Sequence, residues 1–287
     1  MKKNILIVGC GDVGSEAGRL LQRLGYAVYG IKRTVSHNMP FPCVYGDVSD
    51  IESLRACFRQ LPGDIHYLVY TVAPAERTES AYHAAYPEGV KNSLACIDTQ
   101  ILQGFLLVTS TAVYHQQQGQ WVDESTEALP TTFSGQKLLA AEQVLRNASV
   151  NGVAVRLGGI YGPGRERLIS RVKNGCEINR EIPAYTNRIH RDDCAGILSY
   201  LIQMIDSGRK VDNCYVGVDS YPVPEWDVLS CIANLLNIKG PVHNKNLEVL
   251  SQNKRCRNDR VRSLGYEFMF EHYEDGYKQL IHAVKDV

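Results

Sequence analysis

The chain has 287 residues, of which 44% are hydrophobic and 22% are charged, and its 31 basic and 31 acidic side chains give a formal net charge of zero. A chain of this length buries one large core, or one core with a smaller lobe. The charge balance argues against a nucleic-acid-binding protein, which would carry a strong basic excess or a long basic stripe.

The nine cysteines are scattered singly, without a CxxC pair or a His/Cys cluster at metal-ligand spacing. This pattern predicts free thiols in a reducing cytoplasm and no metal site. The apolar run Ile5–Val8 that follows Met-Lys-Lys is too short for a secretory signal, which needs about 7 to 15 apolar residues, or for a membrane span, which needs about 20. We therefore expect a cytoplasmic protein that is neither exported nor embedded in a membrane.

Short apolar runs alternate with amphipathic stretches through the first half of the chain. The expected strands are Ile5–Val8, Ala27–Ile31, Cys43–Tyr45, Ile65–Thr71, Phe105–Thr109 and Val153–Leu157. The expected helices between them are Ser15–Leu24, Asp50–Gln60, Thr78–Gln100 and Gly135–Ala148. Strands that are apolar almost throughout, alternating with helices, predict an α/β fold of the Rossmann type, with a doubly wound parallel sheet.

The regular alternation of strand and helix patterns ends after Leu157, where a glycine-rich segment leads into less regular elements. We expect a helix over Asp192–Ile205, with Asp192 or Asp193 as its N-cap, and another over Glu225–Leu236. No linker separates two independent domains. The expected division is a dinucleotide-binding domain of residues 1–160 plus about 187–215, and a small, interleaved C-terminal substrate lobe of about 161–186 and 216–287.

The most informative motif opens the chain: the first expected strand runs directly into Gly9-Cys10-Gly11-Asp12-Val13-Gly14. This is the GxGxxG fingerprint of dinucleotide-binding proteins, between a strand and a helix. Gly9 permits the tight turn, Gly11 lets the backbone approach the pyrophosphate, and Gly14 lets helix and strand pack closely. The N–H groups of the helix N-terminus then face the phosphates.

The end of the second expected strand predicts which nicotinamide cofactor binds. NAD sites place an acidic residue there for the ribose 2′-hydroxyl, but this chain has Lys32-Arg33. A basic pair suits a 2′-phosphate, since Arg33 can bind it bidentately and Lys32 can neutralise it. NADP(H) is therefore favoured over NAD(H); the alternative is two exposed basic residues at a strand end.

Further segments resemble one family along nearly the whole chain. They are Gly46-Asp47-Val48, Tyr70-Thr71-Val72-Ala73-Pro74, the Leu107–Tyr114 segment with Ser110, the glycine-rich Arg156–Gly164, and Ile189–Ala195. The chain is similar to extended, partly atypical short-chain dehydrogenases/reductases of the NAD-dependent epimerase/dehydratase group, which act on nucleotide sugars and related substrates. The resemblance implies that Asp47 and Val48 contact the adenine, that Thr71, Val72 and Ala73 lie beside the cofactor, and that Ser110 orients the substrate carbonyl.

One departure from the family stands at the catalytic motif, Tyr-x-x-x-Lys. Here the helix begins Phe133-Ser134-Gly135-Gln136-Lys137, so the lysine that the family uses to hold the nicotinamide ribose is present and the tyrosine is replaced by Phe133. A phenyl ring transfers no proton, and general acid–base groups contribute about 10²–10⁴-fold to rates. The standard mechanism is therefore impaired.

Four further residues are candidates for a role in the site. Tyr114 and Tyr161 are candidate surrogate acids, although both also suit structural or substrate-contacting roles. His190 and Asp193 match a family segment in which the acid is mostly a helix N-cap. The expected catalytic residues are Ser110, Lys137 and Tyr114.

The sequence motifs are compatible with two functions. The first is an NAD(P)-dependent epimerase/dehydratase-like oxidoreductase with a non-standard acid, acting on a small molecule such as a nucleotide sugar or another anionic carbonyl or alcohol compound. The second is a catalytically inactive NADP(H)-binding sensor or scaffold. Arg165, Arg167 and Arg171 could meet an anionic substrate or stay solvated. The resemblance also implies a homodimer formed by the helices Thr78–Gln100 and Gly135–Ala148.

Overall fold

The computed structural model describes residues 2–36, 38–61, 63–247 and 253–285. The chain forms two compact units, and it passes between them several times. The first unit comprises Met1–Val113, Ala128–Arg156 and Cys194–Tyr215, and the second comprises Tyr114–Glu127, Leu157–Asp193 and Val216–Val287. The finer domain limits expected from the sequence stay a prediction.

A seven-stranded sheet in the order β12-β7-β5-β4-β1-β2-β3 forms the centre of the first unit. Its strands are β1 (Asn4–Val8), β2 (Ala27–Lys32), β3 (Cys43–Tyr45), β4 (Tyr67–Tyr70), β5 (Gly104–Ser110), β7 (Gly152–Leu157) and β12 (Cys214–Gly217). The pairs from β3 through β5 are parallel. Since strand order reverses between β1 and β4, the sheet is doubly wound and has its switch point there, which confirms the predicted fold class.

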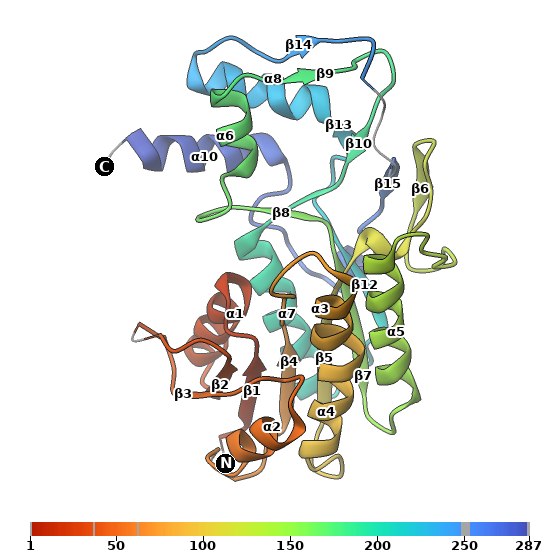
Figure 1. The fold of residues 1–287 in the computed structure, drawn as a ribbon. Helices are drawn as coiled ribbons and strands as arrows, with labels where there is room; N and C mark the ends of the chain where they lie inside the picture. The colour runs from red at the N-terminus through yellow and green to blue at the C-terminus, as the bar shows by residue number, and fades with distance from the viewer. Residues whose placement is uncertain (1, 37, 62, 248–252, 286–287) are drawn as a thin grey trace. The chain divides into compact units, whose positions relative to one another are not determined.

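Helices flank this sheet (Figure 1). They are α1 (Asp12–Arg23), α2 (Ile51–Phe58), α3 (Glu79–His83), α4 (Gly89–Cys96), α5 (Phe133–Asn147) and α7 (Arg191–Asp206), with a 3₁₀ turn η2 (Thr111–Val113) after β5. Strands β1 and β4 are buried almost completely, as expected when both faces of a parallel sheet are covered.

The helix expected over Thr78–Gln100 is continuous from Glu79 to Cys96 but is not α-helical throughout. Thr78 is the N-cap of α3, and a π-helical turn, η1 (Ala84–Glu88), separates α3 from α4, which ends at Cys96. Pro87 lies inside the turn. Proline has no N–H to donate and its ring clashes with the preceding helical turn, so regular α-helix is disfavoured there. The three segments follow one another beside α5 (Figure 1).

The second unit is built from short helices and two-stranded ladders. Its helices are α6 (Arg167–Lys173), α8 (Glu225–Leu236), α9 (Asp259–Ser263) and α10 (Tyr273–Lys285). Its strands are β6 (Gln120–Val122), β8 (Gly159–Tyr161), β9 (Glu177–Ile178), β10 (Tyr185–Thr186), β11 (Arg188–His190), β13 (Val223–Pro224), β14 (Val242–His243) and β15 (Lys254–Cys256). Apolar side chains of α6, α8 and α10 pack into one core, and α8 has the bounds that the sequence predicts.

The expected N-cap of the helix at Asp192 is wrong by one or two residues. Helix α7 begins at Arg191, and the His190 ring takes the capping role, because its Nδ1 accepts the backbone N–H of Asp192 at 3.2 Å. The Asp193 carboxylate instead accepts the backbone N–H groups of Met269 (2.7 Å) and Phe270 (2.9 Å). Asp193 therefore ties the C-terminal region to the start of α7 rather than capping its own helix.

Among the described residues, no helix combines the length and the apolar character that crossing a membrane requires.

Candidate functional site

The fingerprint loop leaves β1 through a turn that requires glycine. Gly9 has a backbone φ of +95°, which residues with a side chain rarely adopt. A Cβ on Gly9 would lie 2.5 Å from the backbone nitrogen of Val72. The Gly9 N–H donates to the Ile31 carbonyl at 2.9 Å, so the loop is also fastened to the end of β2.

Gly14 and Thr71 hold the loop against the end of β4. A Cβ on Gly14 would lie 2.5 Å from both the Gly9 carbonyl oxygen and the Thr71 hydroxyl. The Thr71 hydroxyl donates to that same carbonyl at 2.5 Å. The backbone N–H of Thr71 donates to the Val8 carbonyl at 2.8 Å. Thr71, with half-buried Val72 and exposed Ala73 after it, therefore lies beside the fingerprint at the switch point of the sheet.

Gly11 differs from its two neighbours in the motif because its surroundings are open. It is the N-cap of α1, it makes no side-chain capping bond, and a Cβ built on it would meet nothing within 4 Å. Asp12 begins the helix and Val13 is buried beneath it. A helix N-terminus with free space before its N–H groups is a suitable site for the pyrophosphate of a dinucleotide. The residues present fit the cofactor that the motif implies.

A basic pair and an acid lie at the ends of β2 and β3. Lys32 is half-buried, and its Nζ contacts the Met39 sulfur at 3.9 Å, while Arg33 is exposed. Asp47 accepts hydrogen bonds from the Ser49 N–H (2.9 Å) and hydroxyl (2.7 Å). Burial opposes its ionisation, but these bonds and the charge of Arg33 lower the pKa of Asp47 below its usual value. Asp47 is therefore ionised at neutral pH.

The Val48 side chain, next to Asp47, is 8% exposed and packs into the core of the first unit, so its expected contact with the adenine stays a prediction. Ser110 is half-buried at the carboxyl end of β5. Its hydroxyl oxygen accepts the Ala112 N–H at 3.2 Å and so stabilises the η2 turn. Among the described residues, the Ser110 hydroxyl donates no hydrogen bond.

Helix α5 carries both residues of the altered catalytic motif. Its N-cap is Thr132, whose hydroxyl accepts the Gly135 N–H at 3.2 Å. Phe133 and Lys137 are four residues apart and share one helix face. The Lys137 ammonium lies 2.9 Å from a carboxylate oxygen of Glu79 on α3. The lysine is therefore already paired with an acid that the sequence analysis did not single out.

Tyr82, also on α3, packs against the position of the missing hydroxyl. Its ring lies edge-on to Phe133, with centroids 5.5 Å apart and planes at 90°. Glu79 and Tyr82 are three residues apart, so one face of α3 meets the Phe133–Lys137 face of α5. Sequence reasoning missed both residues. The signal that could have found them is their helical spacing within the helix expected after the fourth strand.

The two tyrosines that the sequence suggests as surrogate acids are both packed inside the second unit. Tyr114 is fully buried, and its hydroxyl donates to the Asp123 carbonyl at 2.7 Å. Tyr161 is also buried, stacked on Tyr277 with centroids 4.6 Å apart, and burial raises its pKa well above the ordinary value. These contacts favour structural roles for Tyr114 and Tyr161.

A buried ion pair anchors α5 to the sheet. The Glu142 carboxylate accepts bonds from the Arg156 guanidinium, at 2.6 Å from one terminal nitrogen and 3.0 Å from Nε, and from the Thr109 hydroxyl at 2.8 Å. Both charged side chains are at most 5% exposed. Thr109 lies on β5 and Arg156 lies on β7, so the cluster fixes α5 against both strands. Lys137 lies on the same helix and is held in place with it.

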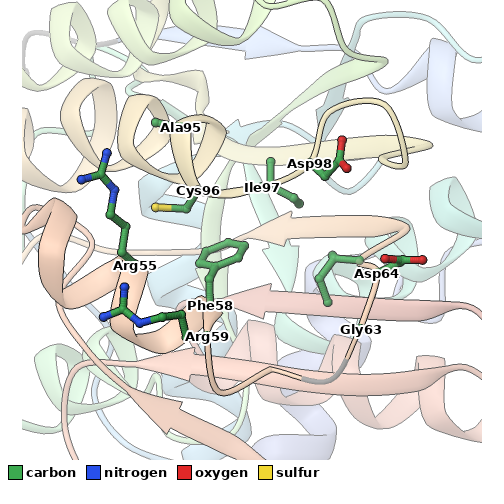
Figure 2. A pocket seen from close by; sticks show the side chains of 10 residues that line it. Arg55, Phe58, Arg59, Gly63, Asp64, Ala95, Cys96, Ile97 and Asp98 are labelled. Atoms are coloured by element: carbon green, nitrogen blue, oxygen red, sulfur yellow. The ribbon is translucent and has the colours of Figure 1, made fainter.

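A cavity of about 390 Å³ lies elsewhere in the first unit (Figure 2). It is lined by Arg55, Phe58, Arg59, Gly63, Asp64, Ile65, Ala95, Cys96, Ile97 and Asp98. Residues 63–65 precede β4, which runs parallel to β1, so the cavity lies at the amino ends of these strands. Ligands of doubly wound sheets bind at the carboxyl ends. The cavity is therefore separate from the dinucleotide site.

The arginines after the glycine-rich segment do not form a free basic cluster. Arg171 pairs with Glu225 at 2.8 Å, and Arg167 is exposed. Within the described residues, no group of three or more His, Cys, Asp or Glu side chains is arranged to hold a metal ion.

Comparison with known proteins places this geometry in a family. Residues 5–217 match the model of the NAD-dependent epimerase/dehydratase family. The chain belongs to this family. It is 32% identical to a protein from Methylobacillus flagellatus that is named for the same family, over 99% of this chain and 100% of that one, with a TM-score of 0.83. The resemblance inferred from the motifs is thereby confirmed.

More distant solved structures share the fold. UDP-glucose 4-epimerase from Thermotoga maritima, solved with UDP-glucose, is 16% identical over 99% of both chains, with a TM-score of 0.81. A human epimerase family protein, solved with NADPH, is 17% identical over 97% of this chain and 99% of that one, with a TM-score of 0.78. No curated protein matches the chain by sequence.

Proposed function

We propose that this family member is an NADP(H)-dependent oxidoreductase or epimerase/dehydratase of the extended short-chain dehydrogenase/reductase type that works without the usual tyrosine. The observation that carries the proposal is the placement of Lys137. It lies on an anchored helix, one turn from Phe133, at the spacing of the family's ribose-holding lysine. The open helix N-terminus at Gly11 supports it, since it offers space for the pyrophosphate.

The preference for NADP(H) over NAD(H) rests on Lys32 and Arg33. No carboxylate occupies the end of β2, where NAD-binding proteins place one, and the two cations suit a 2′-phosphate. The Asp47 carboxylate partly offsets the positive charge of Arg33, because the two groups interact electrostatically and Arg33 lowers the pKa of Asp47. The preference therefore depends on both cations. NADPH in the distant human relative supports this assignment.

Each remaining residue has a defined task in the proposed site. The α1 N-terminus binds the pyrophosphate, and Lys137 leaves Glu79 to bind the nicotinamide ribose. Ser110 donates a hydrogen bond from its hydroxyl to the substrate carbonyl oxygen and so orients the substrate. The bound dinucleotide supplies or accepts the hydride. A proton must also move, and Phe133 has no group that moves it.

We propose a small carbonyl or alcohol compound as substrate, with nucleotide sugars as the first class to test, because a distant relative binds UDP-glucose. The replacement of the tyrosine by Phe133 is the one observation that favours the alternative, an inactive NADP(H)-binding sensor. The retained Lys137 argues for the enzyme, since a protein without hydride chemistry has less need of a ribose-holding lysine at that spacing.

We also propose a homodimer in which α3–α4 and α5 of two copies meet. Leu139 and Val144 on α5 are only half-buried, so they leave apolar surface for a partner. Sedimentation as a monomer at micromolar concentrations would contradict this.

The function is tested by NADPH oxidation with methylglyoxal and para-nitrobenzaldehyde, and by NADP⁺ reduction with UDP-glucose. We expect turnover by the wild-type protein and none by Gly11→Val, whose branched side chain fills the pyrophosphate space. Tight NADPH binding without hydride transfer to any member of a broad carbonyl panel, and without epimerisation or dehydration of UDP-glucose, would establish the sensor instead.

A further inference from the structure

We propose that Tyr82 supplies the hydroxyl that Phe133 lacks and acts as the proton donor and acceptor of the reaction; this assignment rests on the proposed function. The position is the first reason. Tyr82 is the phenol whose ring packs edge-on against Phe133 at 5.5 Å, in the first turns of a helix that starts at the carboxyl edge of the sheet. The two rings come from neighbouring helices, so a phenol lost from α5 is replaced by one from α3.

The free hydroxyl is the second reason. Within the described part of the chain, the Tyr82 hydroxyl makes no hydrogen bond. Two other tyrosines of this unit are engaged: the Tyr70 hydroxyl donates to the Ala85 carbonyl at 2.5 Å, and the Tyr67 hydroxyl donates to Asp206 at 2.8 Å. Tyr114 donates to a carbonyl as well. A half-buried phenol that keeps its proton uncommitted is suited to give it to a ligand.

The local backbone fixes this placement. The Thr78 hydroxyl accepts the Ala81 N–H at 3.3 Å and starts α3, and the π turn around Pro87 ends it directly after Tyr82 and His83. Such turns occur frequently at functional sites. Tyr86 lies within the turn, 5.7 Å from the Tyr82 ring, and burial raises its pKa well above the ordinary value. Tyr86 is therefore a neutral neighbour of the Tyr82 ring.

The Lys137 charge, on the helix face that carries Phe133, suits proton transfer from Tyr82. The Lys137–Glu79 pair is one helical turn away on both helices, so a cation lies close to where an anion forms. In the reducing direction, the carbonyl carbon receives a hydride from a reduced nicotinamide dinucleotide, and the C=O π pair moves to the oxygen. That oxygen takes the Tyr82 proton. The resulting phenolate takes a proton from water, so one hydride and one proton are consumed for each carbonyl reduced.

The test has a readout that does not depend on activity. The protein is nitrated with tetranitromethane, with and without saturating NADPH, and Tyr82 modification is measured by peptide mass spectrometry. We expect NADPH to lower nitration of Tyr82 several-fold in the wild type and to leave it unchanged in Gly11→Val, where no cofactor binds. Nitration of Tyr82 that saturating NADPH does not alter would overturn the assignment.

Turnover of methylglyoxal by matched variants gives the second readout. We expect Tyr82→Phe to lower kcat by about 10²–10⁴-fold with the Kd for NADPH unchanged, and Tyr86→Phe to leave kcat unchanged. Tyr82→Phe combined with Phe133→Tyr should regain activity, because the hydroxyl returns from α5. Full activity in Tyr82→Phe, or a collapse in Tyr114→Phe instead, overturns the assignment and leaves the proposed function standing. A wild type that binds NADPH and shows no turnover overturns the function itself.

Discussion

The Lys137 ammonium lies 2.9 Å from the Glu79 carboxylate, so the lysine that the family uses for the nicotinamide ribose already has a partner. Glu79 is 64% exposed, and an exposed pair of this kind is worth at most about 1 kcal/mol. The lysine can therefore exchange Glu79 for a ribose hydroxyl at small cost, and Glu79 competes with the cofactor for it.

This competition predicts opposite effects of two substitutions. Glu79→Gln should strengthen NADPH binding by up to about fivefold, since it removes the competing carboxylate. Lys137→Met should weaken NADPH binding while the far-ultraviolet circular dichroism stays unchanged. Both are measured by isothermal titration. If Glu79→Gln weakened binding, Glu79 would be a positioning residue for Lys137 rather than a competitor.

The glycines of the fingerprint predict a separation of stability from binding. Gly11→Ala should change the free energy of unfolding by less than about 1 kcal/mol, because its Cβ meets nothing within 4 Å, yet it should reduce NADPH affinity. Gly14→Ala should cost about 1–3 kcal/mol, because its Cβ would overlap the Gly9 carbonyl. Urea unfolding and titration of the same samples give both values. A Gly11→Ala protein with full NADPH affinity would show that the pyrophosphate binds elsewhere.

The buried pair beneath α5 predicts a large loss of stability. Glu142→Ala should lower the free energy of unfolding by about 3–5 kcal/mol, since it leaves the Arg156 charge buried without its carboxylate. The double variant Glu142→Leu/Arg156→Met should recover most of the loss, because apolar residues of similar volume often replace such pairs without penalty. Urea unfolding of the three proteins checks this. A loss below about 1 kcal/mol in Glu142→Ala would show that the pair does not anchor the helix.

Much of the first unit follows from sequence patterns, and the reason is local. The glycine fingerprint, the apolar strands and the Thr132-capped helix are each determined by residues close together in the chain. Helix α8 likewise has its predicted bounds, Glu225–Leu236. Such elements need no knowledge of the rest of the fold, because periodicity and capping specify them.

The features that sequence reasoning missed depend on distant partners. Tyr82 gains its importance only where α3 meets Phe133, 51 positions away in the sequence, and Glu79 only where it meets Lys137. The sequence predicts Asp193 as a candidate cap, because an acid at the start of a helix often is one. Its bonds to Met269 and Phe270 come from residues more than 70 positions later. Ladders of two or three residues in the second unit carry too little periodicity to be predicted.

The cap at the start of α7 predicts a dependence of stability on pH. His190 Nδ1 accepts a backbone N–H, so the ring must be neutral, and burial lowers its pKa to about 4, with Asp192 raising and Arg191 lowering it. The unfolded chain takes up the proton near pH 6.5, whereas the folded chain does so only near pH 4. Stability should therefore fall by up to about 3 kcal/mol as pH decreases through this window.

The comparison with His190→Asn isolates this contribution. Asparagine is a good N-cap that does not titrate, so the variant should lose less stability than the wild type between pH 6.5 and pH 4, whatever its stability at neutral pH. Asp193 and Asp219 act in the opposite direction in both proteins, because burial raises their pKa values. Equal pH slopes by urea unfolding would show that His190 is not the titrating group.

The most direct measurement for the account as a whole is the pair of dissociation constants for NADPH and NADH, determined by isothermal titration of the wild type and of Arg33→Asp. The wild type should bind NADPH at least about tenfold more tightly, because a charged hydrogen bond to the 2′-phosphate contributes about 1.5–3 kcal/mol. Arg33→Asp should shift the preference toward NADH. Equal affinities or an NADH preference in the wild type would contradict the assigned role of Lys32 and Arg33, and the absence of binding to either dinucleotide would contradict the proposed function.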